Sequence, residues 1–214
     1  MRRYRSGRPS LFRAGLRRAL AVMMIAVAPM AGAAGFDCNK ASSRIERQIC
    51  SDPLLGRLDE AMVRAYATAR RAAAAPAVVE DLRRTQRQWL ALRDRCSDTA
   101  CVGAAYLRRL TELRAVGDPL CAGLPDAVPG AWRLETGTGP FEVVELAADG
   151  GFASWLHQRP EIVGAQWHLR GCALTIQIPG EAGAISLELL DATDGLLLLR
   201  GEEDEVSAYA RLSG

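Results

Sequence analysis

The sequence has few of the residues that build catalytic and metal sites. It has only two histidines, His157 and His168, and none of its six cysteines belongs to a C-x-x-C pair. Zinc and redox sites rely on such cysteine and histidine clusters at short spacing. The motifs G-x-S-x-G and H-E-x-x-H and the nucleotide-binding loops are also missing. We therefore expect no catalytic residue, no cofactor and no metal ligand, and a protein that acts by binding.

Acidic residues are absent from the first 34 residues, which contain seven arginines. The apolar run ALAVMMIAVAPMAGAA follows, with Ala31 and Ala33 forming an A-x-A cleavage site before Ala34. This order is typical of a secretory signal peptide, and the apolar run is too short and too interrupted for a spanning helix. We predict that residues 1–34 are a signal peptide cleaved near Ala33, and that the mature chain is periplasmic or secreted in a bacterium. An uncleaved anchor is the rival interpretation. Arg17 and Arg18 could belong to a twin-arginine export signal, so the route of export stays open.

Charge is unevenly distributed over the remaining chain. Residues 35–118 contain 15 basic and 11 acidic side chains, a net charge of +4, whereas residues 119–214 contain 5 basic and 14 acidic ones, a net charge of −9. The basic excess is accompanied by few aromatic residues, so nucleic-acid binding is not expected. The acidic half favours a cationic partner.

All six cysteines follow the predicted cleavage site: Cys38, Cys50, Cys96, Cys101, Cys121 and Cys172. An oxidising compartment favours disulfides in such a chain. Spacing favours a bridge from Cys38 to Cys50, although one of them could instead pair with Cys96. Cys96 and Cys101 would lie roughly 7.5 Å apart along one helix, so a bridge between them requires a bend. The intervening Ser-Asp-Thr supplies a turn, which leaves Cys121 and Cys172 for each other.

The region 35–117 has the pattern of a helical bundle. Ser43 and Glu46 form a capping box for a short helix that ends near Cys50, and Asp52 caps a second helix that begins at Pro53. Two further helices show apolar spacing of three and four residues: Val79, Leu82, Gln86, Trp89 and Arg93 in the first, and Val102, Ala105, Tyr106, Leu110 and Leu113 in the second.

Arg93 and Asp94 are a candidate polar pair in this bundle. Adjacent positions of a helix point about 100° apart, so we expect these two side chains not to pair with each other. We expect Arg93 to pair with Asp59 across the bundle, in a structural role.

The pattern changes after a linker, residues 118–130, that is rich in glycine and proline. Residues 131–214 contain eight runs with a period of two, separated by turn signals such as Asp149-Gly150 and Pro179-Gly180. This predicts an antiparallel meander that closes into a small barrel or sandwich. The fold class is thus α+β in two domains, a disulfide-stapled helical bundle followed by an antiparallel β domain.

The segments FDCNKASSRIERQICSDPLLGRLDEAMVRAY, QRQWLALRDRC and CVGAAYLRRLTEL together resemble the LprI-type lysozyme inhibitor family over about residues 36–114. The matching positions are Cys38, Glu46, Cys50, Asp52, Leu58, Asp59, Tyr66, Gln86, Trp89, Arg93, Asp94, Cys96, Cys101, Tyr106 and Arg109. The resemblance implies an exported helical domain with a lysozyme inhibitor among its relatives, and it assigns no inhibitory residue. In the second domain, Gly130-Ala131-Trp132 resembles the G-x-W opening of lipocalin-like barrels.

Two binding functions follow from these features. The first is a proteinaceous lysozyme inhibitor or related envelope-protective module whose acidic domain attracts a cationic protein such as C-type lysozyme. Its candidate partner-binding residues are the four consecutive acids Glu202, Glu203, Asp204 and Glu205, which otherwise form a solvated turn. The alternative is a lipocalin-like module that binds a small ligand or the cell envelope. Its candidate pocket side chains, which would otherwise fill the barrel, are Trp132, Phe141, Phe152, Trp155, Trp167 and Tyr209.

Overall fold

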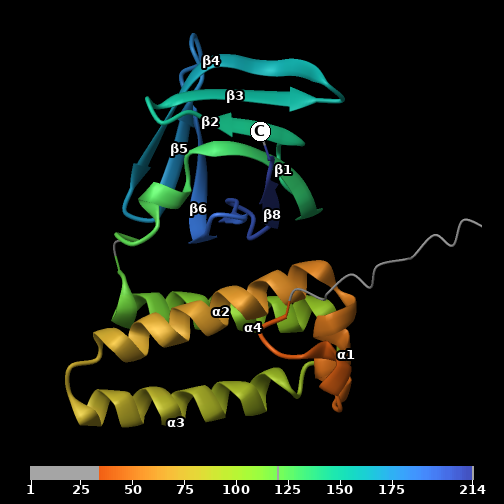
Figure 1. Cartoon of the computed structure of the whole chain (residues 1–214), viewed down its shortest axis with the longest axis vertical. Helices are drawn as coiled ribbons and strands as arrows, with labels where there is room; N and C mark the ends of the chain where they lie inside the picture. The colour runs from red at the N-terminus through yellow and green to blue at the C-terminus, as the bar shows by residue number, and fades with distance from the viewer. Residues whose placement is uncertain (1–33, 120, 214) are drawn as a thin grey trace, which may run out of the picture. The chain divides into compact units, whose positions relative to one another are not determined.

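The computed structural model describes residues 34–119 and 121–213, which belong to one compact unit. The predicted signal peptide lies outside the described residues except for Ala34. The described chain consists of four α-helices followed by eight antiparallel strands in a closed barrel (Figure 1). The predicted α+β class is confirmed, with the barrel as the form of the β domain.

Three of the four helices begin at a residue whose side chain caps them. The four helices are α1 (Arg44–Ser51), α2 (Pro53–Ala72), α3 (Pro76–Arg93) and α4 (Thr99–Gly117), with short 3-10 helices η1 (Cys38–Lys40) and η2 (Pro125–Ala127). The capping box at Ser43 and Glu46 is present, and the backbone N–H groups of Ser43 and Ser42 lower the pKa of Glu46 to about 2. Asp52 and Asp98 accept backbone hydrogen bonds at the starts of α2 and α4. Side-chain caps therefore mark where these three helices begin.

Arg93 lies in a buried polar cluster of the bundle. Its Nη1 is 3.9 Å from Asp59 Oδ1, which confirms the predicted pair. Tyr106 connects the two, because its hydroxyl donates to Asp59 at 2.6 Å and accepts from Arg93 at 3.2 Å. Burial and the Asp59 carboxylate raise the pKa of Tyr106 above its ordinary value, so the hydroxyl keeps its proton.

The prediction that Arg93 and Asp94 do not pair is wrong. Nε and Nη2 of Arg93 donate to Asp94 Oδ1 at 3.0 and 2.8 Å. Helix α3 ends at Arg93, and Asp94 is its C-cap. The 100° offset applies to the directions of the two Cβ atoms. The arginine side chain is long enough to bend back at the helix end, and its guanidinium reaches the Asp94 carboxylate.

The six cysteines form three disulfides: Cys38–Cys50, Cys96–Cys101 and Cys121–Cys172. Between Cys96 and Cys101 the helix is interrupted, since α3 ends before Cys96 and Asp98 caps α4. Their Cα atoms are 5.5 Å apart as a result, well within bridging distance. The alternative bridge to Cys96 is not the one that forms.

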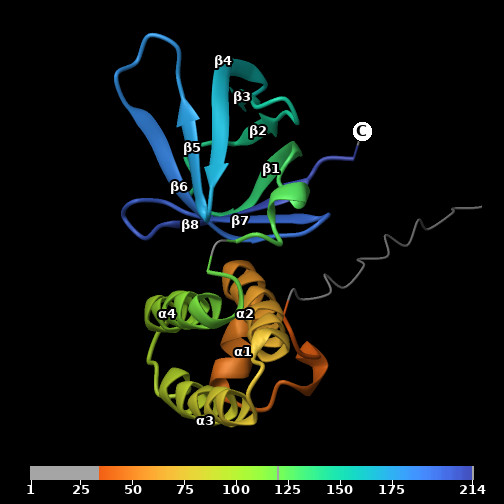
Figure 2. The ribbon, with the colours of Figure 1, turned by 90° about the vertical axis from the view of Figure 1, so that its left-hand side faces the viewer.

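The barrel is an eight-stranded meander. Its strands are β1 (Gly130–Gly137), β2 (Val143–Leu146), β3 (Gly151–Leu156), β4 (Arg159–Arg170), β5 (Ala173–Gln177), β6 (Ala184–Ala192), β7 (Leu196–Arg200) and β8 (Val206–Arg211). Each strand pairs antiparallel with the next, and β8 pairs with β1 to close the sheet. Figure 2 shows the strands from the side. Closure pairs both edges of the sheet formed by residues 130–211, which protects it against edge-to-edge aggregation.

Side chains fill the interior of the barrel. Four of the aromatic residues considered for a pocket are buried in its core: Trp132, Phe141, Phe152 and Tyr209. The rings of Phe141 and Phe152 pack with centroids 5.3 Å apart. Trp155 and Trp167 are only half-buried, and Trp167 Nε1 donates to a main-chain carbonyl. The buried aromatics thus serve as core, as small barrels require.

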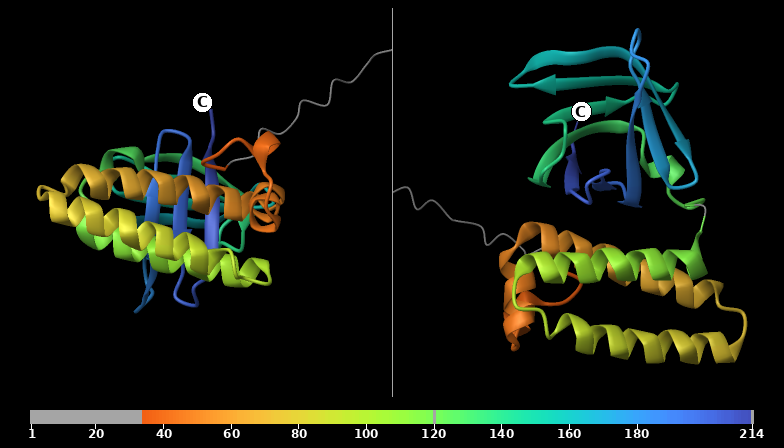
Figure 3. Two further views of the ribbon diagram at one scale, coloured as in Figure 1. Left: turned by 90° about the horizontal axis from the view of Figure 1, so that it is seen from below. Right: turned by 180° about the vertical axis from the view of Figure 1, so that it is seen from behind.

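Strand β7 is buried on both faces. Leu197 and Leu199 belong to the barrel core, whereas Leu196 and Leu198 belong to the helical core. The same helical cluster takes residues from the neighbouring strands as well: Leu190, Val206 and Ala208. Helices α2 and α4 therefore cover the outer face of β6, β7 and β8 (Figure 3). This explains the unbroken run LLLL, because alternation between a polar and an apolar face is lost when both faces are buried.

Arg211, the last residue of β8, contacts Trp132 of β1 and several main-chain carbonyls. Its guanidinium lies 4.1 Å from the ring centroid of Trp132. The same group donates to the carbonyls of Ala127, Pro129 and Asp194. It therefore joins the last strand to the segment that precedes β1.

We predict that Arg211→Ala lowers the free energy of unfolding by about 2 kcal/mol, since it removes a cation–π contact and the donors to two partly buried carbonyls. Urea unfolding followed by tryptophan fluorescence measures this. The matched control is Arg170→Ala, at an exposed position of β4. Equal losses in the two variants would contradict the role of Arg211.

Candidate partner-binding surface

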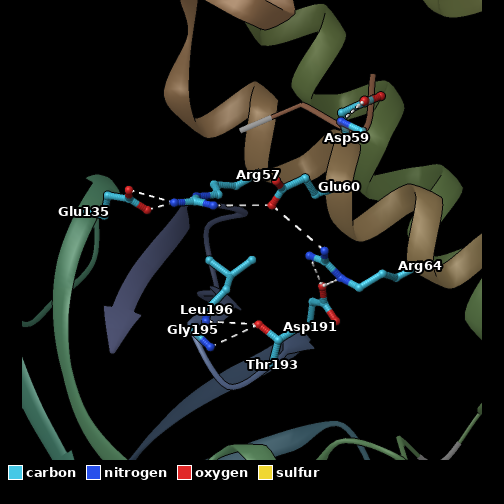
Figure 4. A network of polar contacts seen from close by, with 10 residues as sticks. Arg57, Asp59, Glu60, Arg64, Glu135, Asp191, Thr193, Gly195 and Leu196 are labelled. Carbon is cyan, nitrogen blue, oxygen red and sulfur yellow. Dashed lines mark hydrogen bonds and ion pairs between the residues drawn. The ribbon is translucent and has the colours of Figure 1, made fainter. Parts of the chain in front are cut away.

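Ion pairs connect α2 and α4 to the barrel. Arg57 of α2 donates from Nε and Nη2 to the two carboxylate oxygens of Glu135 in β1, at 2.9 and 2.8 Å (Figure 4). This two-pronged geometry is the strong form of an arginine–carboxylate contact, and Glu135 raises the pKa of Arg57. Arg57 also lies 3.3 Å from Glu60 of its own helix.

A second pair joins the same helix to β6. Arg64 Nε donates to Asp191 Oδ2 at 2.7 Å, and Arg64 also reaches Glu60 at 3.9 Å. Burial raises the pKa of Asp191, and the Arg64 guanidinium opposes this. The adjoining β6–β7 turn is held by Thr193, whose hydroxyl accepts from the backbone N–H of Leu196 at 3.1 Å (Figure 4).

The third connection comes from α4. Arg114 Nη1 donates to Glu188 at 2.9 Å, and its Nη2 donates to the Leu190 carbonyl at 2.6 Å. Burial lowers the pKa of Arg114, although Glu188 counteracts this. Glu188 is shared, because Arg200 of β7 also pairs with it. Three arginines of the helices thus neutralise three acids of the barrel, and we call this set the junction pairs: Arg57–Glu135, Arg64–Asp191 and Arg114–Glu188.

The four candidate partner-binding acids lie in the β7–β8 turn. Glu202, Glu203 and Asp204 are exposed, and Glu205 is half-buried. Asp204 has a φ of 62° and lies 3.6 Å from Arg200. The Glu205 carboxylate accepts from the backbone N–H of Glu203 at 3.0 Å, and so supports the turn. Glu202 and Glu203 therefore present free carboxylates, as far as the described residues show.

A cleft of about 610 Å³ adjoins this turn. Its apolar lining comes from leucines of α2 and α4 and from Val206. The charged residues that line it are Asp52, Arg108, Arg200 and Asp204. Its apolar lining beside an acidic turn is a composition suited to contact with another protein.

The histidines do not form a site. His157 lies exposed in the β3–β4 turn with a φ of 50°, and His168 lies exposed on β4. Within residues 34–119 and 121–213, no group of three or more His, Cys, Asp or Glu side chains is arranged to hold a metal ion. In the same part of the chain, no helix combines the length and hydropathy needed to span a membrane.

Sequence reasoning missed the junction pairs. Arg57 and Arg64 are seven positions apart and so lie on one face of α2, but many arginines in this chain share such spacings. The available signal was the charge contrast between residues 35–118 and 119–214, which indicates attraction without naming the partners.

We predict that Arg57 and Glu135 are coupled by about 1 kcal/mol in a double-mutant cycle with Arg57→Ala and Glu135→Ala, because the contact is bidentate and partly shielded from water. The free energies of urea unfolding of the four proteins measure it. Arg83 and Glu80, an exposed pair 3.5 Å apart on α3, provide the control cycle, in which coupling should be near zero. A coupling energy no larger for Arg57–Glu135 than for this control would refute the prediction.

Comparison with known families finds a similarity in the helical part of the chain. Residues 38–116 match the family described as Lysozyme inhibitor LprI. The match includes α1 to α4 apart from the last residue of α4, and it ends before the barrel. The predicted resemblance is confirmed over this region. No curated protein matches the chain.

Proposed function

We propose that the mature chain is an exported inhibitor of lysozyme that binds a cationic enzyme of the C type through its acidic barrel. The observation that carries the proposal is the match of residues 38–116 to the LprI family. The proposed compartment is the periplasm or the secreted fraction, after cleavage near Ala33, and the proposed mode of action is binding without turnover.

The distribution of charge supports a cationic partner. The junction pairs occupy only three of the 14 acids in residues 119–214. Other barrel acids are exposed, among them Glu145, Glu161 and Glu181. A surface of this kind accelerates association with a basic protein, and salt reduces the effect because the Debye length is only about 8 Å at physiological ionic strength.

The β7–β8 turn is the proposed contact element. It combines free carboxylates at Glu202 and Glu203 with a backbone held by the Asp204–Arg200 pair and the Glu205 hydrogen bond. A turn fixed in this way loses little conformational freedom on binding. The adjoining cleft gives an apolar surface to bury in the same contact.

The small-ligand alternative has less support. Four of its candidate aromatic residues are buried in the barrel core, where they contact other core side chains. The cleft beside the β7–β8 turn is outside that core. We therefore place the functional surface on the outside of the barrel.

The direct test is inhibition by purified residues 34–214 with the disulfides intact. We expect the protein to slow the clearing of a cell-wall suspension by C-type lysozyme, with inhibition that weakens as salt increases. Undiminished clearing at a large molar excess would reject the proposal.

The contact element is tested with Glu202→Gln/Glu203→Gln, against the control Glu145→Gln/Glu161→Gln, which removes the same charge from exposed strand positions. Both variants should associate with lysozyme a few-fold more slowly, because steering depends on total charge. Only the variant in the turn should also dissociate faster, by about tenfold, as contact residues govern dissociation. Surface plasmon resonance separates the two rates, and identical dissociation rates would place the contact elsewhere.

A further inference from the structure

The first described residues are docked against α2. The backbone N–H of Gly35 donates to Asp59 Oδ2 at 2.9 Å. Ala34 and Phe36 pack against the helical core on either side of it. A Cβ atom at Gly35 would lie 2.5 Å from Cγ2 of Val63, so a larger residue at this position would require the Val63 side chain to move.

The acceptor of this contact is the buried carboxylate of Asp59. Asp59 is 3% exposed, and its other oxygen accepts from the Tyr106 hydroxyl. Among the described residues, Arg93 is the cation paired with Asp59, at 3.9 Å, and its hydrogen bonds go to the exposed Asp94 and to Tyr106. The buried Asp59 carboxylate thus has no hydrogen bond from a cation in this part of the chain. Burial of a carboxylate is costly, and a further cation that donates to it would reduce that cost.

The predicted cleavage site supplies that cation. Hydrolysis of the Ala33–Ala34 peptide bond by a signal peptidase consumes one water and leaves a carboxylate on Ala33 and an ammonium group on Ala34. Consecutive backbone nitrogens are only about 3 Å apart, so this ammonium nitrogen begins within about 6 Å of Asp59 Oδ2. A carboxylate oxygen that has accepted one hydrogen bond has room for a second.

We propose that the α-ammonium group released at Ala34 binds the buried carboxylate of Asp59, so that removal of the signal peptide gives this carboxylate a second cationic partner besides Arg93. In the uncleaved chain the same nitrogen is an uncharged amide and cannot do this. The helical domain is then less stable before cleavage than after it, and processing and folding are linked. This inference rests on the predicted cleavage site and is independent of lysozyme binding.

A distinctive feature of the sequence makes the test selective. Lys40 is its only lysine. In a Lys40→Arg background, residues 34–214 retain the α-amine as the single primary amine, and its rate of acetylation as a function of pH reports its pKa. We expect a pKa about one unit above the ordinary range of roughly 7.7 to 8.0. An ordinary value would overturn the proposal.

Two substitutions identify the partner of the amine. Asp59→Asn keeps the acceptor for Gly35 and removes the charge, and it should return the amine pKa to its ordinary value. Asp37→Asn is the matched control, because Asp37 is an exposed carboxylate closer in sequence to Ala34. It should leave the raised pKa in place. A raised pKa that disappears in Asp37→Asn, or persists in Asp59→Asn, contradicts the assignment.

Stability provides the second measurement. Acetylation of Ala34 should increase the unfolding equilibrium constant about tenfold with Asp59 present, equivalent to the one-unit pKa shift, and leave it unchanged in Asp59→Asn. If Asp59→Asn does not fold, a chain extended by Gly-Ser before Ala34 replaces it. That extension moves the amine away while Asp59 stays, so its amine pKa should be ordinary. A pKa that stays raised in the extended chain would overturn the proposal.

Discussion

The folded unit depends on the burial of β7 between two cores. Its inner leucines pack with Trp132 and Tyr209 inside the barrel, and its outer leucines pack with the leucines of α2 and α4. Each fully buried leucine contributes on the order of 2 kcal/mol of hydrophobic stabilisation. A small bundle and a small barrel are each marginal alone. The shared strand makes the helices and the barrel stabilise one another, and the junction pairs fix their orientation.

Much of this architecture is readable from the sequence because local rules determine it. The capping box at Ser43 and Glu46 and the Pro53 start of α2 follow from the backbone hydrogen bonds that helix ends require. The strands other than β7 follow from period-two patterns and turn residues, and β7 follows from an unbroken apolar run. The choice of a barrel over a sandwich does not, since it depends on pairing between β1 and β8, at opposite ends of the domain.

Side-chain partners were less predictable. Arg93 was correctly assigned to Asp59, but its contact with Asp94 depends on where α3 ends to within one residue. The run LLLL predicts a buried strand without saying what covers each face. The proposed site residues Glu202 to Glu205 lie at the expected turn, and their role in binding remains a prediction that sequence pattern cannot decide, because exposed acids serve solubility equally well.

The junction pairs distinguish two groups of acids in the barrel: those paired with the helices and those of the β7–β8 turn. Three of these acids are paired with arginines of the helices, which partly neutralises their charge: Glu135, Glu188 and Asp191. In the described residues, the acids of the β7–β8 turn form no ion pair with those helix arginines. Asp204 pairs instead with Arg200 of β7. The helical domain, matched to the inhibitor family, thus holds the barrel, while the barrel presents the remaining negative charge.

The bridge between Cys121 and Cys172 has a consequence for a chain exposed to proteases. It encloses the connecting segment, with its exposed Asp126, together with β1 to β4 in a covalent loop. A single backbone break anywhere within that loop leaves two pieces that are still tied through sulfur. The helices and the barrel consequently stay together after such a nick, and they separate only when a reductant opens the loop as well.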